Sequence, residues 1–145
     1  MAGCTSTSVL ESGLNVSGNT KSQYSSVNDV RRKFGLSVLQ RDPVLERMAK
    51  EQSRLMAKHL KMTHNTERGQ RFAQRLKRAG YNRLAAENLA EGYKSRGETM
   101  DAWVRSKPHR RNMLNPRMKR YGLGVVETDH PTRGKRKYWT LVLGG

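Results

Sequence analysis

The stretch Trp103-Val-Arg-Ser-Lys-Pro-His-Arg-Arg-Asn-Met-Leu-Asn-Pro116 decides how the rest of this sequence is interpreted. Upstream of it, Ser95 and Glu98 have the spacing of a capping box, which predicts that a helix starts there. Three apolar residues then recur at helical spacing and should face a core: Met100, Trp103 and Val104. The stretch therefore predicts a helix packed on a core through a tryptophan.

Pro108 is expected to end this helix, because the residue before a proline is pushed out of the α region. His109 follows and should lie on an irregular corner of the chain. A titratable imidazole on such a corner is a common place for chemistry. His109 is thus the first candidate site residue.

The charge of the chain is strongly one-sided. Its 145 residues carry 29 Lys+Arg against 12 Asp+Glu, a net charge of +17, and 34% of them are hydrophobic. Residues 1–24 contain only Glu11 and Lys21, which cancel, so the excess lies downstream. No apolar run reaches the ~18 residues of a membrane-spanning helix. The expected partners are anionic: membrane or envelope components, acidic polymers or nucleic acid.

The single cysteine lies in Met1-Ala2-Gly3-Cys4, which resembles the end of a bacterial lipoprotein signal with methionine in place of leucine. Residues 5–26 are polar and unsuited to a core, as in a flexible tether. We therefore expect lipidation at Cys4, a tether over residues 1–24 and a folded domain over residues 25–145. The chain would be extracytoplasmic, either membrane-anchored or secreted. The alternative is a cytosolic protein with an unimportant thiol.

Three helices are expected before residue 80. The first runs from Val27 to Phe34, the second from Val44 to about Met62 after the start signal Asp42-Pro43, and the third over residues 66–79. The second helix has one apolar and one basic face. His59 falls on the apolar face and is interpreted as a structural histidine. On the third helix, the arginines are expected to point outward: Arg68, Arg71, Arg75 and Arg78.

Glu87 stands in the apolar run Leu84–Ala90. An ionised carboxylate in such surroundings needs a partner, which a metal, a hydrogen bond or an ion pair supplies. His64 follows the second helix and His109 follows the proposed break, so both are candidates. We expect His64, Glu87 and His109 to converge in one cleft.

The C-terminal part changes to a period of two. Residues 121–126 and 137–143 predict an antiparallel hairpin, and Gly122 and Gly124 would permit close backbone approach. The turn residues between these strands place His130 in a loop. Helices followed by a hairpin, without βαβ alternation, favour an α+β layered domain.

Seven motifs in order resemble the bacterial branch of the CAP superfamily, the SCP domain of cysteine-rich secretory, antigen 5 and pathogenesis-related proteins. They are Asp42-Pro43, Thr63-His64, residues 86–90, Trp103 with residues 106–110, residues 112–116, residues 122–125 and residues 138–140. The match covers nearly all of residues 26–145. It implies an α-β-α sandwich of three layers with a central, mainly antiparallel sheet. It also implies a cleft with two histidines and two acidic residues.

The resemblance places the two cleft histidines on His64 and His109 and one acidic residue on Glu87, with Asn88 beside it. The second acidic position falls near Ser106, so the full set is absent. Two further departures are Lys107-Pro108 for the usual Pro-Gly and Thr140-Leu141 for the usual Thr-Gln. His64, His109 and Glu87 match an open zinc site with a water, which would be weak, or a hydrogen-bonded group that fixes the cleft.

These features favour a binding module over an enzyme, because no nucleophile stands in a catalytic context. The ligand would be a lipid, another small hydrophobic ligand or a divalent metal. A metal-dependent hydrolase or protease in the same cleft is the alternative. A nucleic-acid binder is less favoured, because no aromatic residues interleave with the basic ones.

Overall fold

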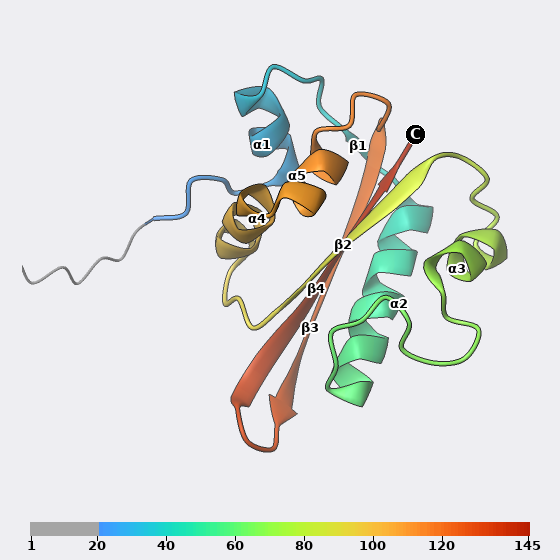
Figure 1. Ribbon diagram of the computed structural model, residues 1–145, viewed down its shortest axis with the longest axis vertical. Coiled ribbons are helices and arrows are strands. Elements are labelled where there is room, and N and C mark those ends of the chain that lie inside the picture. The colour runs from blue at the N-terminus through green and yellow to red at the C-terminus, as the bar shows by residue number, and fades with distance from the viewer. Residues whose placement is uncertain (1–20) are drawn as a thin grey trace, which may run out of the picture.

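A four-stranded sheet lies between two layers of helices in the computed structural model, which describes residues 21–145 (Figure 1). Its strands are β1 (Gln40–Arg41), β2 (Ala85–Glu91), β3 (Arg120–His130) and β4 (Gly134–Gly144). The order across the sheet is β1-β3-β4-β2, with β1 parallel to β3 and the other pairs antiparallel. The expected α+β sandwich with a mainly antiparallel sheet is confirmed. Cys4 and the proposed tether up to residue 20 lie outside the described residues.

Three helices cover one face of the sheet and two cover the other (Figure 1). The first layer holds α1 (Val27–Lys33), α4 (Arg96–Arg105) and α5 (Lys107–Met113). The second holds α2 (Pro43–His59) and α3 (Phe72–Arg78). None of the helices in residues 21–145 has the length and apolarity needed to cross a membrane.

The larger core lies under α1, α4 and α5. Trp103 is 1% exposed and its indole N–H donates to the Leu89 carbonyl at 2.8 Å, which ties α4 to β2. Trp139 makes the same kind of bond to the Tyr93 carbonyl at 2.9 Å. Each ring therefore buries its apolar body while its one donor stays satisfied.

Helix α2 begins and ends as its sequence dictates. The Asp42 carboxylate accepts hydrogen bonds from the N–H groups of Val44 and Leu45, at 2.8 and 3.2 Å, and Pro43 occupies the first turn. At the other end, Leu60 adopts the left-handed conformation, with φ 51°. The helix therefore ends at His59, before the expected Met62.

Two glycines of β3 set the distance between the sheet and α2. A Cβ atom on Gly122 would lie 2.1 Å from the Glu46 nitrogen, and one on Gly124 would lie 2.4 Å from the Ala49 carbonyl carbon. These distances fall far below van der Waals contact, so only glycine permits this approach. The close backbone contact expected from the sequence is confirmed.

The region around Pro108 differs from the expectation. Helix α4 ends at Arg105, Ser106 is extended (φ −87°, ψ 115°), and a new helix starts at Lys107. Pro108 lies in the first turn of α5, where its missing N–H costs nothing. His109 is therefore in a helix, and the irregular corner expected there is wrong.

Smaller corrections concern three other residues. Helix α3 starts at Phe72 and not near residue 66. His130 is the last residue of β3, where its ring accepts a hydrogen bond from the Thr132 N–H at 3.2 Å, so it does not belong to a loop. Phe34 is 47% exposed and lies just beyond the end of α1.

Candidate functional site

Glu87 on β2 is the buried carboxylate around which the candidate site is arranged. Its side chain is 2% exposed. Arg75 of α3 holds both of its oxygens: Nη1 donates to Oε2 at 2.8 Å and Nη2 donates to Oε1 at 2.7 Å. This two-point pairing compensates the cost of burying the carboxylate.

Arg75 was expected to point outward, and that expectation is wrong. Its side chain is 4% exposed, its Nε donates to the Gln70 carbonyl at 3.0 Å, and its guanidinium lies 5.3 Å from the Phe72 ring centre. The sequence contains the signal that was missed. Arg75 follows Phe72 by three residues and precedes Leu76 by one, so it shares the inward face of α3.

His64 makes the third contact of this group. Its Nδ1 lies 2.7 Å from Glu87 Oε1, and its ring is 52% exposed. Because this oxygen belongs to an acceptor carboxylate, we assign a proton to Nδ1, and Nε2 is the ring nitrogen that Glu87 does not contact. The turn before His64 is held by Gln52, whose amide donates to the Thr63 carbonyl at 2.6 Å.

His59, the last residue of α2, does not contact the group of Arg75, Glu87 and His64. Its Nε2 is 2.6 Å from Glu67 Oε1, and its side chain is 36% exposed. The expected position on the apolar face of α2 is therefore wrong.

Asn88 links β2 to the helix that carries His109. Its amide donates to the His109 carbonyl at 3.1 Å, and its oxygen accepts from Asn112 at 2.8 Å. The side chain is fully buried. Asn88 thus positions α5, and both ends of its amide group are engaged by that helix.

His109 is half-buried on the first turn of α5. Burial lowers the pKa of His109 below its usual value of 6.5, and the nearby charge of His64 lowers it further. The convergence of His64, Glu87 and His109 in one cleft stays a prediction, because His109 lines a groove whose lining does not include His64 or Glu87. His64, Glu87 and Asn88 are joined to their neighbours by hydrogen bonds, whereas His109 and Ser106 face a separate groove.

The three residues expected to bind metal do not fit a metal site. Within residues 21–145, no three His, Cys, Asp or Glu side chains converge as a metal centre. Both Glu87 oxygens accept from Arg75, and the Nδ1 of His64 is used by the same carboxylate. A cation would have to displace the Arg75 guanidinium, whose like charge opposes it. Arg75, Glu87 and His64 form a hydrogen-bonded group, which is the alternative to a zinc site that the sequence left open.

A groove of about 360 Å³ opens beside His109 at the β2 edge of the sheet. Its lining combines apolar and polar residues: Met62, Leu89, Ala90, Glu91, Tyr93, Ala102, Trp103, Ser106, His109, Arg133 and Arg136. Ser106 and His109 lie in this lining, whereas His64 lies outside it. The volume falls in the range of small-molecule sites.

The polar end of the groove carries unsatisfied groups. Arg133 Nη1 lies 2.9 Å from Glu91 Oε1 in an ion pair without hydrogen-bond geometry, and Arg136 Nε lies 3.9 Å from the same oxygen. Arg136 Nε and Glu91 Oε1 are buried without hydrogen-bond partners in the described part of the chain. Two guanidinium groups therefore face one carboxylate, which leaves this end positive. Sequence reasoning missed both arginines, because they lie in the hairpin, far in sequence from His109.

This fold and this site define a class of protein. The chain belongs to the CAP family, described as the cysteine-rich secretory protein family, whose model matches residues 24–143. The family expected from the seven motifs is confirmed.

The relatives are bacterial. The chain is 34% identical over 114 residues to the uncharacterized protein YkwD of Bacillus subtilis. The aligned region covers 78% of this chain and 44% of that protein. It resembles the structure of an extracellular protein with an SCP domain from Bacillus anthracis, with a TM-score of 0.68 and 26% identity over 81% of this chain and 37% of that one. An outer surface protein of Borrelia burgdorferi shares the fold, with a TM-score of 0.66 and 23% identity over 81% of this chain and 85% of that one. The chain thus spans less than half the length of the first two.

Replacing Arg75 by methionine should lower the free energy of unfolding by about 3–5 kcal/mol, because Glu87 would be left buried and uncompensated. The exposed Lys77 of the same helix is the matched control, and Lys77→Met should change stability by less than about 0.5 kcal/mol. Urea unfolding measures both. The double variant Arg75→Met/Glu87→Gln should recover part of the loss. An Arg75→Met protein as stable as the parent would contradict the role assigned to this pair.

His109 should titrate below its usual pKa of 6.5 in an NMR titration over about pH 5 to 8, because burial disfavours its charged form. The His64→Gln variant should raise this pKa only in part, since burial is the larger cause. Because the pKa of His109 is lower in the folded state, the unfolded state binds more protons than the folded state does as the pH falls through 6.5. Unfolding free energy should therefore decrease there, and His109→Gln should reduce the decrease. A His109 pKa at or above 6.5 would exclude this arrangement.

Proposed function

We propose that this chain is a binding module of the bacterial cell envelope, whose groove beside His109 takes a small amphipathic molecule with an anionic group. The apolar part of the ligand would lie against Trp103, Tyr93 and Met62, and its anionic group would face Arg133 and Arg136. The module would be extracytoplasmic, anchored through a lipid on Cys4 or secreted. The descriptions of two structural relatives as an extracellular protein and an outer surface protein support this location.

The observation that carries the proposal is the composition of the groove. The groove has a volume of about 360 Å³ and a mainly apolar lining. The guanidinium groups of Arg133 and Arg136 also line it, and both face the Glu91 carboxylate. Ligand sites combine a mainly apolar wall with a few polar groups that fix orientation. Arg133, whose side chain is 40% exposed in the lining, is such a polar group.

Binding without turnover is favoured over catalysis for two reasons. Glu87 is engaged by Arg75 through both oxygens and is not available as a general acid or metal ligand. Two hydroxyls line the groove with His109, those of Tyr93 and Ser106, and neither makes a hydrogen bond to the His109 ring among the described residues. A divalent metal is therefore not part of the proposed ligand.

One observation favours the alternative, a hydrolase. Glu87 orients His64, and the ring is 52% exposed. A histidine held by a carboxylate can act as a general base on water. Hydrolysis abolished by His64→Gln and retained by Arg133→Gln would support this alternative over the binding module.

The basic surface supports contact with anionic envelope components. Arg47 of α2 is exposed, as is Arg71 next to α3. Arg54 and Lys58 are exposed too but pair with Glu51 and Glu67 at 2.7 and 2.9 Å. Arg75 does not contribute, since it is buried. Nucleic acid is not favoured, because stacking aromatics do not accompany these charges.

Decanoate should bind the groove more tightly than decanol of the same chain length, because Arg133 and Arg136 interact with its carboxylate. Replacing Arg133 and Arg136 together by glutamine should weaken decanoate binding by about tenfold and leave decanol binding unchanged. Isothermal titration calorimetry measures both ligands below their micellar concentrations. Arg41→Gln, on the opposite edge of the sheet, is the matched control. Equal binding of decanoate by the double variant and the parent would refute the site.

The Cys4→Ser chain, which cannot be lipidated, should bind anionic vesicles at low salt and not neutral ones. Each Lys or Arg near an anionic surface adds about 1 kcal/mol, and salt screens it. The double variant Arg47→Glu/Arg71→Glu should bind less. Co-sedimentation with vesicles of stated composition measures this. Absence of binding at low salt would leave Cys4 as the only proposed attachment.

A further inference from the structure

The outer edge of β3 is open over most of its length. Strand β1 pairs only with Arg120 and Tyr121. The Tyr121 carbonyl accepts from the Asp42 N–H at 2.9 Å on that side. Main-chain groups alternate between the two edges of a strand, and the ladder with β4 has one residue opposite one throughout. Leu123, Val125 and Glu127 therefore direct their N–H and C=O groups away from β4.

No strand lies beside these three residues in the part of the chain that the structure describes. Val125 is also 44% exposed, although it is a large apolar residue. In Figure 1 the hairpin extends past the layer of α1, α4 and α5. An open strand edge of this kind is a template for pairing with another chain.

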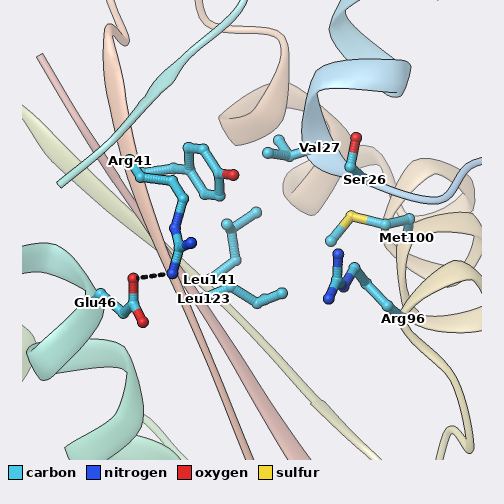
Figure 2. A pocket seen from close by; sticks show the side chains of 9 residues that line it. Ser26, Val27, Arg41, Glu46, Arg96, Met100, Leu123 and Leu141 are labelled. Atoms are coloured by element: carbon cyan, nitrogen blue, oxygen red, sulfur yellow. Dashed lines mark hydrogen bonds and ion pairs between the residues drawn. The ribbon is translucent and has the colours of Figure 1, made fainter. Parts of the chain in front are cut away.

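A pocket of about 170 Å³ lies where this open edge begins (Figure 2). Its apolar lining comes from both the helices and the sheet: Val27, Met100, Tyr121, Leu123 and Leu141. Because β1 and β2 form opposite edges of the sheet, this pocket is distinct from the groove beside His109.

The volume of this pocket limits its occupant. Sites for drug-sized ligands measure about 300–1,000 Å³, and a water takes about 30 Å³ of liquid volume. A space of 170 Å³ is too small for such a ligand but admits one apolar side chain. The pocket and the open edge together match the recognition of an extended peptide, in which main-chain bonds give affinity and a pocket gives specificity.

The charge of the pocket rim indicates which peptide. Arg96 of α4 lies on the rim beside Met100 (Figure 2) and makes no ion pair within residues 21–145. Arg41, on the other side, pairs with Glu46 at 2.6 Å. A second copy of this chain is disfavoured at the edge, because each copy carries a net charge of +17.

We propose that the open edge of β3, from Leu123 to Glu127, docks an extended acidic peptide as an added strand. One apolar side chain of the peptide enters the pocket, and an acidic side chain two residues along, on the same face of the added strand, pairs with Arg96. This surface is separate from the proposed ligand groove and does not depend on it.

The probe is the capped peptide acetyl-Thr-Val-Leu-Glu-Val-Thr-amide, titrated into the full ¹⁵N-labelled chain. Amide shifts and slowed hydrogen exchange are expected at Leu123, Val125 and Glu127. Two further peptides carry N-methyl groups on alternate amides, one on the odd and one on the even positions. Because an added strand pairs through one edge only, one of the two should lose at least about tenfold in affinity and the other should not.

Three variants complete the test. Val125→Pro removes an edge N–H that is not part of the β3–β4 ladder and should weaken binding about fivefold or more without unfolding the sheet. Arg96→Glu should weaken binding by a similar factor, whereas Arg105→Glu, an exposed site on the same helix, should not. The β3–β4 amide shifts of each variant report whether the sheet is intact.

Several outcomes would overturn the proposal. Shifts confined to the residues around His109, equal loss or equal retention of binding by the two N-methylated peptides, or absence of binding at millimolar peptide would each do so. Shifts at Leu123 and Val125 that depend on protein concentration, with a dimer in sedimentation, would identify the occupant as a second copy.

Discussion

The Arg75–Glu87 pair is the interaction on which the candidate site depends. It joins α3 to β2. It also orients His64, because Glu87 Oε1 lies 2.7 Å from the Nδ1 of His64. The segment between α2 and α3 has no helix of its own. It is held by this contact, by the Gln52 bond to the Thr63 carbonyl, and by the contacts of Lys58 and His59 with Glu67. A buried ion pair contributes little net stability but strongly disfavours arrangements that separate its members. The pair therefore specifies where His64 lies more than it stabilises the fold.

The large positive charge of the chain is not confined to its surface. Arg31 is fully buried and donates to the carbonyls of Ser37, Met113 and Asn115 at 2.7, 2.9 and 3.0 Å. These bonds tie α1 to the segment after α5, a region without regular structure. Burial lowers the pKa of Arg31, and the carbonyl oxygens compensate part of that cost. Two arginines thus connect irregular segments internally, which suits a chain with a modest share of apolar residues.

Local signals predicted most of the fold, because they depend on neighbours in sequence. The Asp42-Pro43 start, the period of two in the hairpin and the glycines at 122 and 124 each have a direct structural counterpart. The break near Pro108 was placed wrongly, since proline both ends and begins helices and the sequence alone did not decide between them.

The candidate site could be predicted only in part. The burial of Glu87 followed from its apolar neighbours, but its partner did not, because a buried arginine and an exposed one look alike in composition. The spacing of Arg75 to Phe72 does predict its inward position. The position of Arg133 and Arg136 in the groove could not be predicted from the sequence. Only the pairing of β2 with β4 brings Glu91 opposite Tyr138 and near Arg136.

The order of strands has a consequence for how the chain is made. Strand β4 is the last of the four in sequence, yet it lies inside the sheet and is the shared partner of β2 and β3. Until residues 134–144 have been synthesised, β2 has no neighbour, and the apolar faces of the helices have no sheet to cover. Domains fold as units, and long-range strand pairing is slow compared with helix formation. The sheet of residues 21–145 is therefore expected to assemble only after β4 has been synthesised.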